Sequence, residues 1–370
     1  MALHLAESDR SIDIHAHFID RDAIASMSAI APDVAPSIHQ RDNAWFMDLP
    51  AGVVRSHPNG VTRALPDGLV DVARRLDDMD GQGVDIQAIS GYTWTNFYAL
   101  PGDVAAELHR VHNEGMLRTV HEHPDRFLAI PGLPMQDPAR SVVEIDRLAS
   151  DPSVVGVGIG TNIDGVDLDD PRFEPVWESL DHHNLGVLVH PPGLIAGADR
   201  MRRYHLINLI GNPVDSTIAI ASVIFSGLLD RYRNLRFCFV HGGGFAPYQV
   251  GRWDHGWKVR PEAQEHISSH PAGYLRRCFF DSLTHDPVAL GFLGQQVGWD
   301  QVMLGTDYPW DMSTTTPLDD LDSSGADQQQ QHLVTSANAA RFLRMPGSTP
   351  TQQLSTATTA GSSRSSREEI

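Results

Sequence analysis

Eight short apolar segments recur along the chain, and the helix-like stretches between them restrict the possible folds more than any other feature. We interpret these segments as β-strands at residues 11–15, 84–90, 127–133, 154–160, 186–190, 236–241, 278–282 and 301–306. The intervening stretches with helical spacing include residues 102–123, 138–150, 172–184 and 288–297. Alternating strands and helices predict a parallel sheet, and eight such units predict a closed α/β barrel of the (β/α)₈, or TIM, type.

Two long segments and a polar end interrupt this alternation. Residues 18–70 are rich in Pro and Gly and poorly periodic, so we expect an insertion after the first strand. Residues 191–235 are also longer than one helix needs, and extra segments at this end of a barrel commonly build active-site walls. We predict one barrel domain over residues 1–345, closed by a helix at 333–343. The polar composition of residues 346–370 predicts a disordered tail.

Charge and composition argue against several classes of partner. The chain carries 28 basic and 47 acidic residues, a formal net charge of −19. Acidic proteins repel nucleic acid and anionic membranes, so we expect neither as a partner. The N-terminus has no basic region followed by an apolar stretch, and no apolar run approaches about 18 residues, which predicts a soluble, cytoplasmic protein. Cys238 and Cys278 lie in apolar runs, which favours buried reduced thiols.

Metal-binding residue types end four of the predicted strands. His15 and His17 end the first strand, and residues two apart in a strand face the same side, so both can point into the barrel mouth. His190 ends the fifth strand, His241 the sixth, and Asp307 follows the eighth. Taken singly, each histidine has an ordinary structural explanation as a hydrogen-bonded core or surface residue. Asp307 alone could equally cap a helix or a turn.

The joint placement of these residues is far more informative, because all of them would lie at one end of one barrel. Catalytic residues of this fold gather at that end. Imidazole and carboxylate groups bind zinc, manganese and iron alike. A bound divalent ion lowers the pKa of its water, and a nearby imidazole can then move a proton. The pattern therefore predicts a metal-dependent enzyme.

Six stretches between residues 12 and 310 carry a resemblance to a known family: IDIHAHF, LDDMDGQGVDIQ, VLVHPP, FVHGGGFAPYQVGRWDHGW, YLRRCFFDSLTHD and VMLGTDYPW. Their order resembles the amidohydrolase superfamily. More narrowly, it resembles the decarboxylase branch typified by 2-amino-3-carboxymuconate 6-semialdehyde decarboxylase. The resemblance implies a set of metal ligands, which are His15, His17, His190 and Asp307. It also implies that His241, together with Asp307, carries out catalysis on the metal-bound water.

Two arginines match further positions of that branch. Arg252, eleven residues after His241, matches an arginine that reaches into the active site of a neighbouring subunit. Arg63 lines up with an arginine that binds a substrate carboxylate, which guanidinium groups clamp through paired hydrogen bonds. The resemblance thus implies a homodimer or higher oligomer.

Other positions limit the metal count and the substrate. Two-metal members of the superfamily need a bridging Lys or Glu after the fourth strand, where this chain has none, so we expect a single ion. Pro192 and Asp311 depart from the residues usual in the branch, and both belong to the pocket wall. Tyr92 and Trp94 either line the pocket or simply pack. His285 follows the seventh strand near the mouth and either touches the site or supports it. We expect four histidines of one helix to be solvated: His109, His112, His121 and His123.

Several reactions remain open for such a site. The leading prediction is metal-dependent, nonhydrolytic decarboxylation of a small carboxylated aromatic or muconate-like acid. The alternatives are hydrolysis of an amide or lactone, hydration of a similar acid, and oxygen chemistry at iron or manganese on the same barrel. A non-catalytic subunit fits least well, because the full set of ligands is present. We expect zinc as the cofactor, with manganese and iron also compatible.

Overall fold

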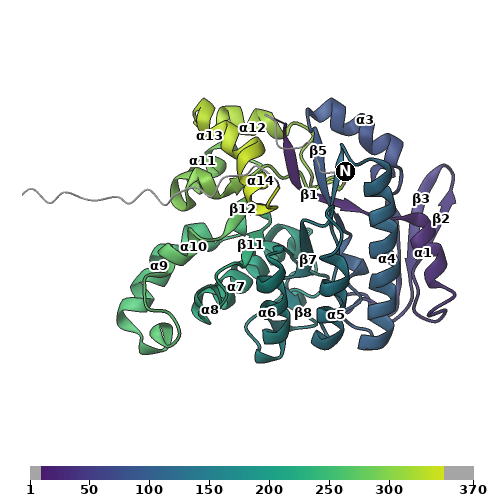
Figure 1. The fold of residues 1–370 in the computed structure, drawn as a ribbon, viewed down its shortest axis with the longest axis horizontal. Coiled ribbons are helices and arrows are strands. Elements are labelled where there is room, and N and C mark those ends of the chain that lie inside the picture. Colours follow the sequence, from purple (N-terminus) through teal and green to yellow (C-terminus); the bar gives the residue numbers. More distant parts are fainter. Residues whose placement is uncertain (1–9, 346–370) are drawn as a thin grey trace, which may run out of the picture.

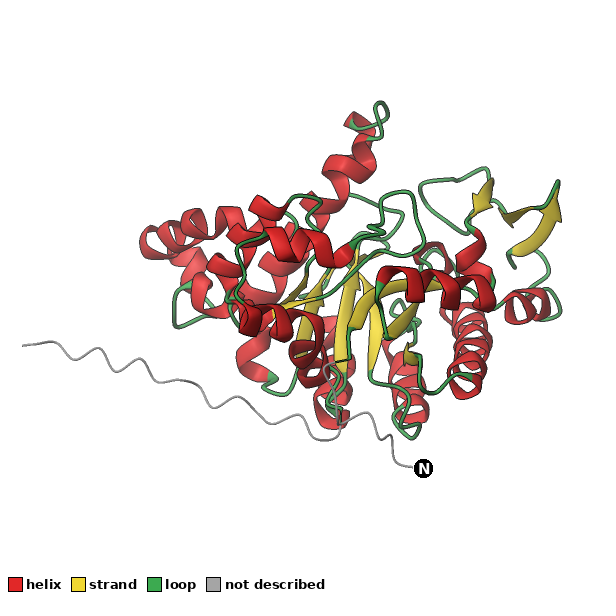
Figure 2. Cartoon of the chain, turned by 90° about the horizontal axis from the view of Figure 1, so that it is seen from above, coloured by secondary structure: helices red, strands yellow, loops and turns green. Residues whose placement is uncertain are grey.

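The computed structural model describes residues 10–345, so the predicted disordered tail lies outside the described residues. Eight parallel strands occupy its centre, and helices surround them (Figures 1 and 2). The strands are β1 (Ile12–Phe18), β5 (Ile86–Gly91), β6 (Phe127–Ile130), β7 (Gly156–Gly160), β10 (Gly186–His190), β11 (Arg236–Phe239), β12 (Phe279–Asp281) and β13 (Val302–Met303). Each of them falls at a predicted strand, which confirms the parallel α/β prediction.

Hydrogen bonds close these strands into a ring. Three strands pair in the order β1-β5-β6, and five pair in the order β13-β12-β11-β10-β7. A parallel bridge between Gly132 and Gly158 joins β6 to β7. At the other seam, the Ile14 N–H donates to the Leu304 carbonyl at 2.9 Å, and Ala16 bridges Tyr308. The carboxyl ends of all eight strands therefore meet at one mouth.

Helices cover the outside of the ring. The principal ones are α3 (Val72–Gln82), α4 (Gly102–Glu122), α5 (Pro138–Leu148), α6 (Glu174–His183), α7 (Asn212–Phe225), α9 (Ala246–Val259) and α11 (Pro287–Val297). Shorter helices are α8 (Leu228–Arg231), α10 (Pro271–Leu275), α12 (Pro317–Ser323), α13 (Gln328–His332) and α14 (Asn338–Phe342). Asp71, Asp137 and Asp286 begin α3, α5 and α11, and each side chain accepts a hydrogen bond from the first turn.

Helix α14 closes the bottom of the barrel. It lies within residues 333–343, where the sequence predicted a closing helix. Its Phe342 is fully buried and packs with Ile14, Leu188 and other side chains of the barrel interior. A Cβ atom at Gly186 would approach the Phe342 ring to 2.8 Å, so the strand can lie this close only with glycine. The interior below the mouth is thus filled and apolar, and the polar residues gather above it.

The segment after β1 has more structure than its poor periodicity suggests. It contains α1 (Arg21–Met27), a small antiparallel sheet and α2 (Asp67–Val70). The sheet consists of β2 (Ser37–Arg41), β3 (Ala44–Leu49) and β4 (Val61–Leu65), and it lies at the edge of the molecule (Figures 1 and 2). A second short hairpin, β8 (Asn162–Ile163) and β9 (Val166–Asp167), follows β7. Both additions stand next to the mouth of the barrel.

Two smaller predictions can also be compared with the structure. Cys238 and Cys278 are buried free thiols, as predicted, and burial raises the pKa of Cys278 to about 12. The helix Ile207–Phe225 is long and apolar enough to cross a bilayer by length and composition, which the search for apolar runs missed. The core helix of a globular protein meets the same criteria, so this observation is weak evidence for a membrane.

Candidate metal centre and active site

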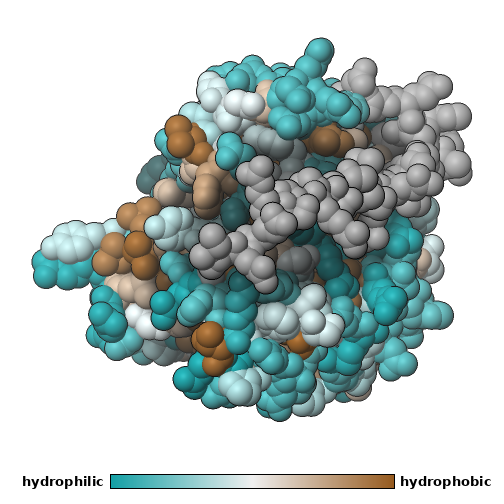
Figure 3. Space-filling model, turned by 90° about the vertical axis from the view of Figure 1, so that its left-hand side faces the viewer, coloured by the Kyte–Doolittle hydropathy of each residue, from teal (hydrophilic) through white to brown (hydrophobic). Residues whose placement is uncertain are grey.

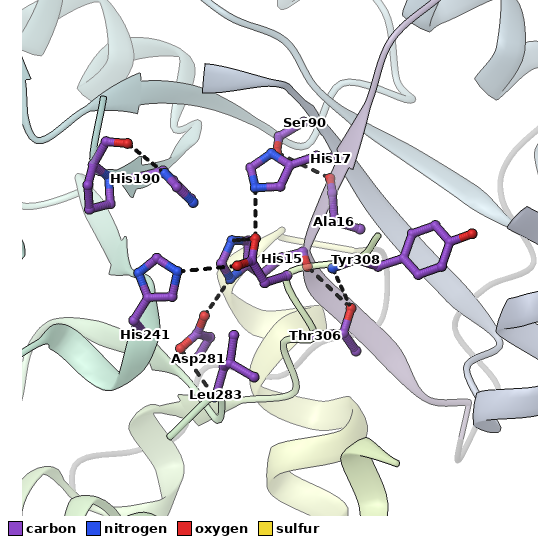
Figure 4. Close-up of polar contacts among 12 residues, drawn as sticks. His15, Ala16, His17, Ser90, His190, His241, Asp281, Leu283, Thr306 and Tyr308 are labelled. Atoms are coloured by element: carbon purple, nitrogen blue, oxygen red, sulfur yellow. Dashed lines mark hydrogen bonds and ion pairs between the residues drawn. The ribbon is translucent and has the colours of Figure 1, made fainter. Parts of the chain in front are cut away.

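Four side chains converge at the mouth of the barrel, and Figure 4 labels the three histidines among them. His15 and His17 lie on β1, His190 ends β10, and Asp307 follows β13. Each offers one ligand atom, and these four atoms all lie within 4.8 Å of one another. His15, His17 and Asp307 are buried, with exposed fractions of 0%, 2% and 6%. Residues distant in the sequence therefore form one compact cluster of donors.

In each of the three histidines, the Nδ1 atom contacts an acceptor that is not one of the four donors. The partners are a carboxylate oxygen of Asp281 for His15 (2.7 Å), the Gly91 carbonyl for His17 (3.2 Å) and the Pro191 carbonyl for His190 (2.9 Å). A ring that donates its Nδ1–H to an acceptor keeps a lone pair on Nε2, and metal-binding histidines in proteins are commonly oriented in this way. The Nε2 atom of His190 is buried and has no hydrogen-bond partner, and the buried Nε2 atom of His15 lies 3.3 Å from Asp307 Oδ1.

The two acceptors around His17 are satisfied better if a cation is bound beside the ring than by a neutral ring alone. Its Nδ1 faces the Gly91 carbonyl, and its Nε2 lies 3.0 Å from Asp307 Oδ1, so both ring nitrogens face acceptors. A neutral imidazole has only one N–H, and burial lowers the pKa of His17, which disfavours the doubly protonated ring. A divalent ion between Nε2 and the carboxylate would satisfy both atoms. The donor set of three imidazoles and one carboxylate fits such an ion.

The cluster also has the electrostatics of a cation site. Burial by itself would raise the pKa of Asp307, but His15, His17 and His241 outweigh it and hold that pKa well below its usual range. Burial would likewise lower the pKa of His15, but Asp307 and Asp281 on either side raise it to about 10. Two carboxylates therefore favour positive charge at this ring, whether it is carried by a proton or by a metal ion.

His241 lies beside the four donors. Its Nε2 is 3.6 Å from Asp307 Oδ2, and its ring centroid is 5.1 Å from that of His190. Its Nδ1 is buried without a hydrogen-bond partner. The glycines that follow allow the close packing here, because a Cβ atom at Gly243 would meet the Phe280 ring at 2.6 Å. His241 is thus placed next to the cluster, with one ring nitrogen free.

Three of the four donors line a cavity of about 270 Å³ that the segment after β1 helps to form. Arg63, on β4, lines this cavity together with His17, His190 and Asp307. Its guanidinium carbon lies 4.5 Å from the centre of the Trp310 ring and 4.9 Å from that of Trp94, so aromatic rings hold the cation in place. The structure therefore brings Arg63 to the candidate site, across a long stretch of sequence.

Arg252 does not share that position. It lies on α9 with an exposed side chain, and it is absent from the described residues that line the 270 Å³ cavity. His285 lines a second cavity of about 500 Å³, together with His241. Asn208, Asn212 and Met312 line both cavities, so the two adjoin. Tyr92 and Trp94 are buried and line the first cavity, so their packing and pocket-lining roles coincide.

Sequence reasoning erred on two histidines and missed one aspartate. His109 and His112 were expected to be solvated but are only 2% and 3% exposed, because they lie on the face of α4 that packs on the barrel. The missed residue is Asp281, which is fully buried at the end of β12. Besides holding His15, it accepts a hydrogen bond from the Gly242 N–H at 2.8 Å. An acid near the end of the apolar strand predicted at 278–282 was the available signal.

Comparison with known proteins agrees with this geometry. The family model described as amidohydrolase matches residues 12–345. The 2-amino-3-carboxymuconate-6-semialdehyde decarboxylase of Dictyostelium discoideum is 35% identical over 273 residues, which cover 73% of this chain and 75% of that protein. This is a match over most of both chains.

Solved structures show the same fold. The 5-carboxyvanillate decarboxylase of Sphingomonas paucimobilis superposes with a TM-score of 0.76 at 24% identity, over 91% of this chain and 100% of that one. A dihydroxybenzoic acid decarboxylase of Polaromonas sp., with bound manganese and 2-nitroresorcinol, gives a TM-score of 0.73 at 18% identity, over 91% and 97%. Family match, relative and fold together place the chain in the amidohydrolase superfamily, in the branch of the 2-amino-3-carboxymuconate-6-semialdehyde decarboxylases.

Proposed function

We propose that the chain is a metal-dependent, nonhydrolytic decarboxylase of a small carboxylated aromatic or muconate-like acid. Its branch identifies it as a carbon–carbon lyase of the carboxy-lyase type. The observation that carries the proposal is the convergence of three imidazole Nε2 atoms on one buried carboxylate, beside an arginine in the same cavity. Such a site can hold a metal ion and orient a substrate carboxylate near it.

In this proposal, His15, His17, His190 and Asp307 hold one divalent ion. Zinc and manganese both suit three imidazoles and a carboxylate, and the Polaromonas relative contains manganese. When bound, the ion supplies a Lewis acid that polarises substrate oxygens and makes bound water more acidic. Asp281 supports it indirectly by fixing the ring of His15.

The reaction exchanges a carboxylate for a proton. The bond between the carboxylate carbon and the neighbouring substrate carbon breaks, CO₂ leaves, and the electron pair stays on the substrate carbon. A proton delivered to that carbon completes the balance. His241 is the group we assign to this proton transfer, because it lies beside the four donors and has one ring nitrogen without a partner. Asp307, 3.6 Å from the other ring nitrogen of His241, would orient it as well as bind the ion.

Arg63 would fix the substrate. Its guanidinium group lines the same cavity as three of the proposed ligands, and the ring faces of Trp94 and Trp310 restrict its movement. A guanidinium group held in this way can form paired hydrogen bonds with a carboxylate. We propose that it binds a substrate carboxylate and so sets the orientation of the bond that breaks.

The site would be completed by assembly. Hydrophobic side chains gather on the face of the molecule to which α9 and α11 contribute (Figure 3), and Tyr248 and Val288 are 76% and 78% exposed there. Exposed patches of this kind are typical of protein interfaces. We propose a homodimer or larger oligomer in which Arg252 of one subunit reaches the active site of the next.

The test is an assay of the purified protein with carboxylated aromatic and muconate-like acids, after its metal content has been measured. We expect about one equivalent of a divalent ion and release of CO₂ in step with loss of substrate absorbance. Uptake of ¹⁸O from water without CO₂ would instead indicate hydrolysis or hydration. Oxygen consumption would indicate redox chemistry, and either result would overturn the proposal.

A further inference from the structure

A small polar cavity lies behind the candidate metal centre, on the side of α4. Its volume is about 20 Å³, and the rings of His17 and His190 form one of its walls. His109 and His112 of α4 also line it, so four imidazoles surround the same space. His17 and His190 also line the substrate cavity, so each of these two rings faces both spaces.

Glycines make room for the two histidines of α4. A Cβ atom at Gly132 would lie 3.0 Å from the Nδ1 and Cε1 atoms of His109. A Cβ atom at Gly91 would lie 3.3 Å from Cε1 of His112. Larger residues at these positions would push the imidazoles away, so the cavity depends on specific small residues of the barrel wall.

The polar groups around the cavity are only partly paired. His109 Nε2 lies 2.8 Å from the Asn96 carbonyl and donates to it, which leaves Nδ1 as an acceptor if the ring is neutral. Burial lowers the pKa of both His109 and His112 to about 4, so both rings are neutral near pH 7. The Nε2 atom of His112 is buried and has no hydrogen-bond partner.

Two hydroxyl groups add further acceptors. Ser90 Oγ donates to the Ala16 carbonyl at 3.2 Å, and Thr95 Oγ1 donates to the Tyr92 carbonyl at 2.7 Å. Each oxygen therefore keeps lone pairs for another partner. No carboxylate is among the described residues that line the cavity, which argues against a calcium or magnesium ion there.

We propose that this cavity binds one ordered water molecule, held by His112, and that the water fills the space behind the rings of His17 and His190. Because the Nδ1 atom of each of these rings already faces a backbone carbonyl and Nε2 faces the ion site, the water limits tilting of the rings by contact and not by a hydrogen bond to them. A buried water needs about 10–15 Å³ and two to four polar partners, and this cavity offers both. His112 is then a positioning residue that acts on the proposed metal ligands through the water. The part concerning the ligands rests on the proposed metal site, whereas the water site itself does not.

The decisive experiment compares two histidines of α4. His112→Leu removes the unpaired nitrogen from the cavity, and His112→Asn keeps a polar side chain in it. His121→Leu is the matched control, because His121 lies near the end of the same helix with a side chain that is 56% exposed. For each folded variant, the dissociation constant of Zn²⁺ or Mn²⁺ alone is measured by competition with a chromogenic chelator. The metal-loaded protein is also crystallised and searched for the water.

We expect ordered water density within hydrogen-bond distance of His112 in the wild type and none in His112→Leu. Residues that position metal ligands without binding the ion themselves typically change metal affinity by 10–100-fold, so His112→Leu should bind the ion about tenfold more weakly. His112→Asn and His121→Leu should stay close to the wild type.

A dry cavity in a high-resolution wild-type structure overturns the water site. Unchanged metal affinity in folded His112→Leu overturns the support that the water gives to the ligands. If His112→Leu does not fold, His112→Phe, which keeps a ring but has no ring nitrogen, replaces it in both measurements. Failure of wild-type protein to bind metal would refute the proposed function instead.

Discussion

Asp307 and His241 hold their side chains in the site from unusual backbone conformations. Their φ angles are 59° and 56°, in the left-handed region that residues other than glycine seldom occupy. Such conformations cost roughly 1–3 kcal/mol each and persist only where the surrounding structure imposes them. At Asp307 the Asp307 N–H donates to the His15 carbonyl at 2.9 Å, which fixes the carboxylate next to the ring it faces. Here backbone strain coincides with the residues to which we assign chemistry.

At the scale of single residues, Asp307→Ala should strip the ion while leaving the barrel folded. The substitution removes the one carboxylate among the four donors but leaves the apolar interior untouched. We expect metal content, measured by elemental analysis after identical purification, to fall from about one equivalent to near zero. Asp311→Ala is the control, because Asp311 lines the same cavity but lies outside the donor cluster. A stoichiometric ion in purified Asp307→Ala would refute this ligand.

His241→Ala should lower kcat by roughly a hundredfold or more, the usual scale for loss of an acid–base group. Because His241 is not one of the four clustered donors, metal content should remain close to that of the wild type. His255→Ala, an exposed histidine of α9, serves as the control. Near-normal turnover with an unchanged pH profile in His241→Ala would rule out the assigned role.

At the scale of elements, the strands were predictable because a barrel strand buried on both faces must be apolar along its length. Even so, the first strand was placed at 11–15, whereas β1 runs to Phe18 and carries His17 within it. The histidines of α4 were misread from polarity alone. Leu108, His109, His112 and Met116 recur at helical spacing and are all buried, so periodicity would have identified the packed face.

The rest of the site depends on contacts that a single sequence does not contain. Arg63 reaches the cavity because it lies on β4 of the small antiparallel sheet. The periodicity of residues 18–70 does not indicate how the strands of that sheet pair. His109 fits against the barrel because Gly132 leaves room for its ring, and the two are distant in sequence. Asp281 acts through His15, 266 residues away, so its importance is visible only in three dimensions.

The buried histidines of α4 should make the protein sensitive to acid. Burial lowers the pKa of His109 and His112 to about 4, compared with about 6.5 in an unfolded chain. Between these values the unfolded chain binds protons that the folded protein does not, so stability is lost as the pH falls. Each histidine should thereby remove about 2 kcal/mol from the free energy of unfolding between pH 7 and pH 5.

Urea unfolding of metal-free protein at pH 7 and pH 5 measures this loss. His112→Leu should lose less stability than the wild type over the interval, because one of the two protonation sites is gone. His182→Leu, which removes an exposed histidine of α6, should follow the wild type. An identical loss in His112→Leu and the wild type would show that His112 does not contribute to acid sensitivity.

At the scale of the whole molecule, exposed hydrophobic residues and the exposed Arg252 lie on the same face. Phe245 and Tyr248 belong to the segment that also carries Arg252, and Phe292 of α11 lies 6.3 Å from Tyr248 between ring centroids. The 500 Å³ cavity beside His241 is lined by all three of these aromatic residues. An interface on this face would therefore cover the entrance next to the proposed acid–base residue.

This arrangement predicts that activity depends on assembly. Arg252→Ala should raise KM or abolish activity without loss of metal, because Arg252 is not among the four donors. The sharper measurement mixes Arg252→Ala with His241→Ala at a substrate concentration at which each variant alone has little activity. In a mixed dimer, one site carries both defects and the other carries neither. With random exchange in a two-fold dimer, roughly a quarter of the wild-type activity should return. Exchange is verified independently with differently tagged subunits. As a control, a mixture of His241→Ala with Arg260→Ala, at an exposed position just beyond α9, should show about half of the wild-type activity, because Arg260→Ala is active on its own. Confirmed exchange without recovery would refute a shared site, even if the protein proved dimeric.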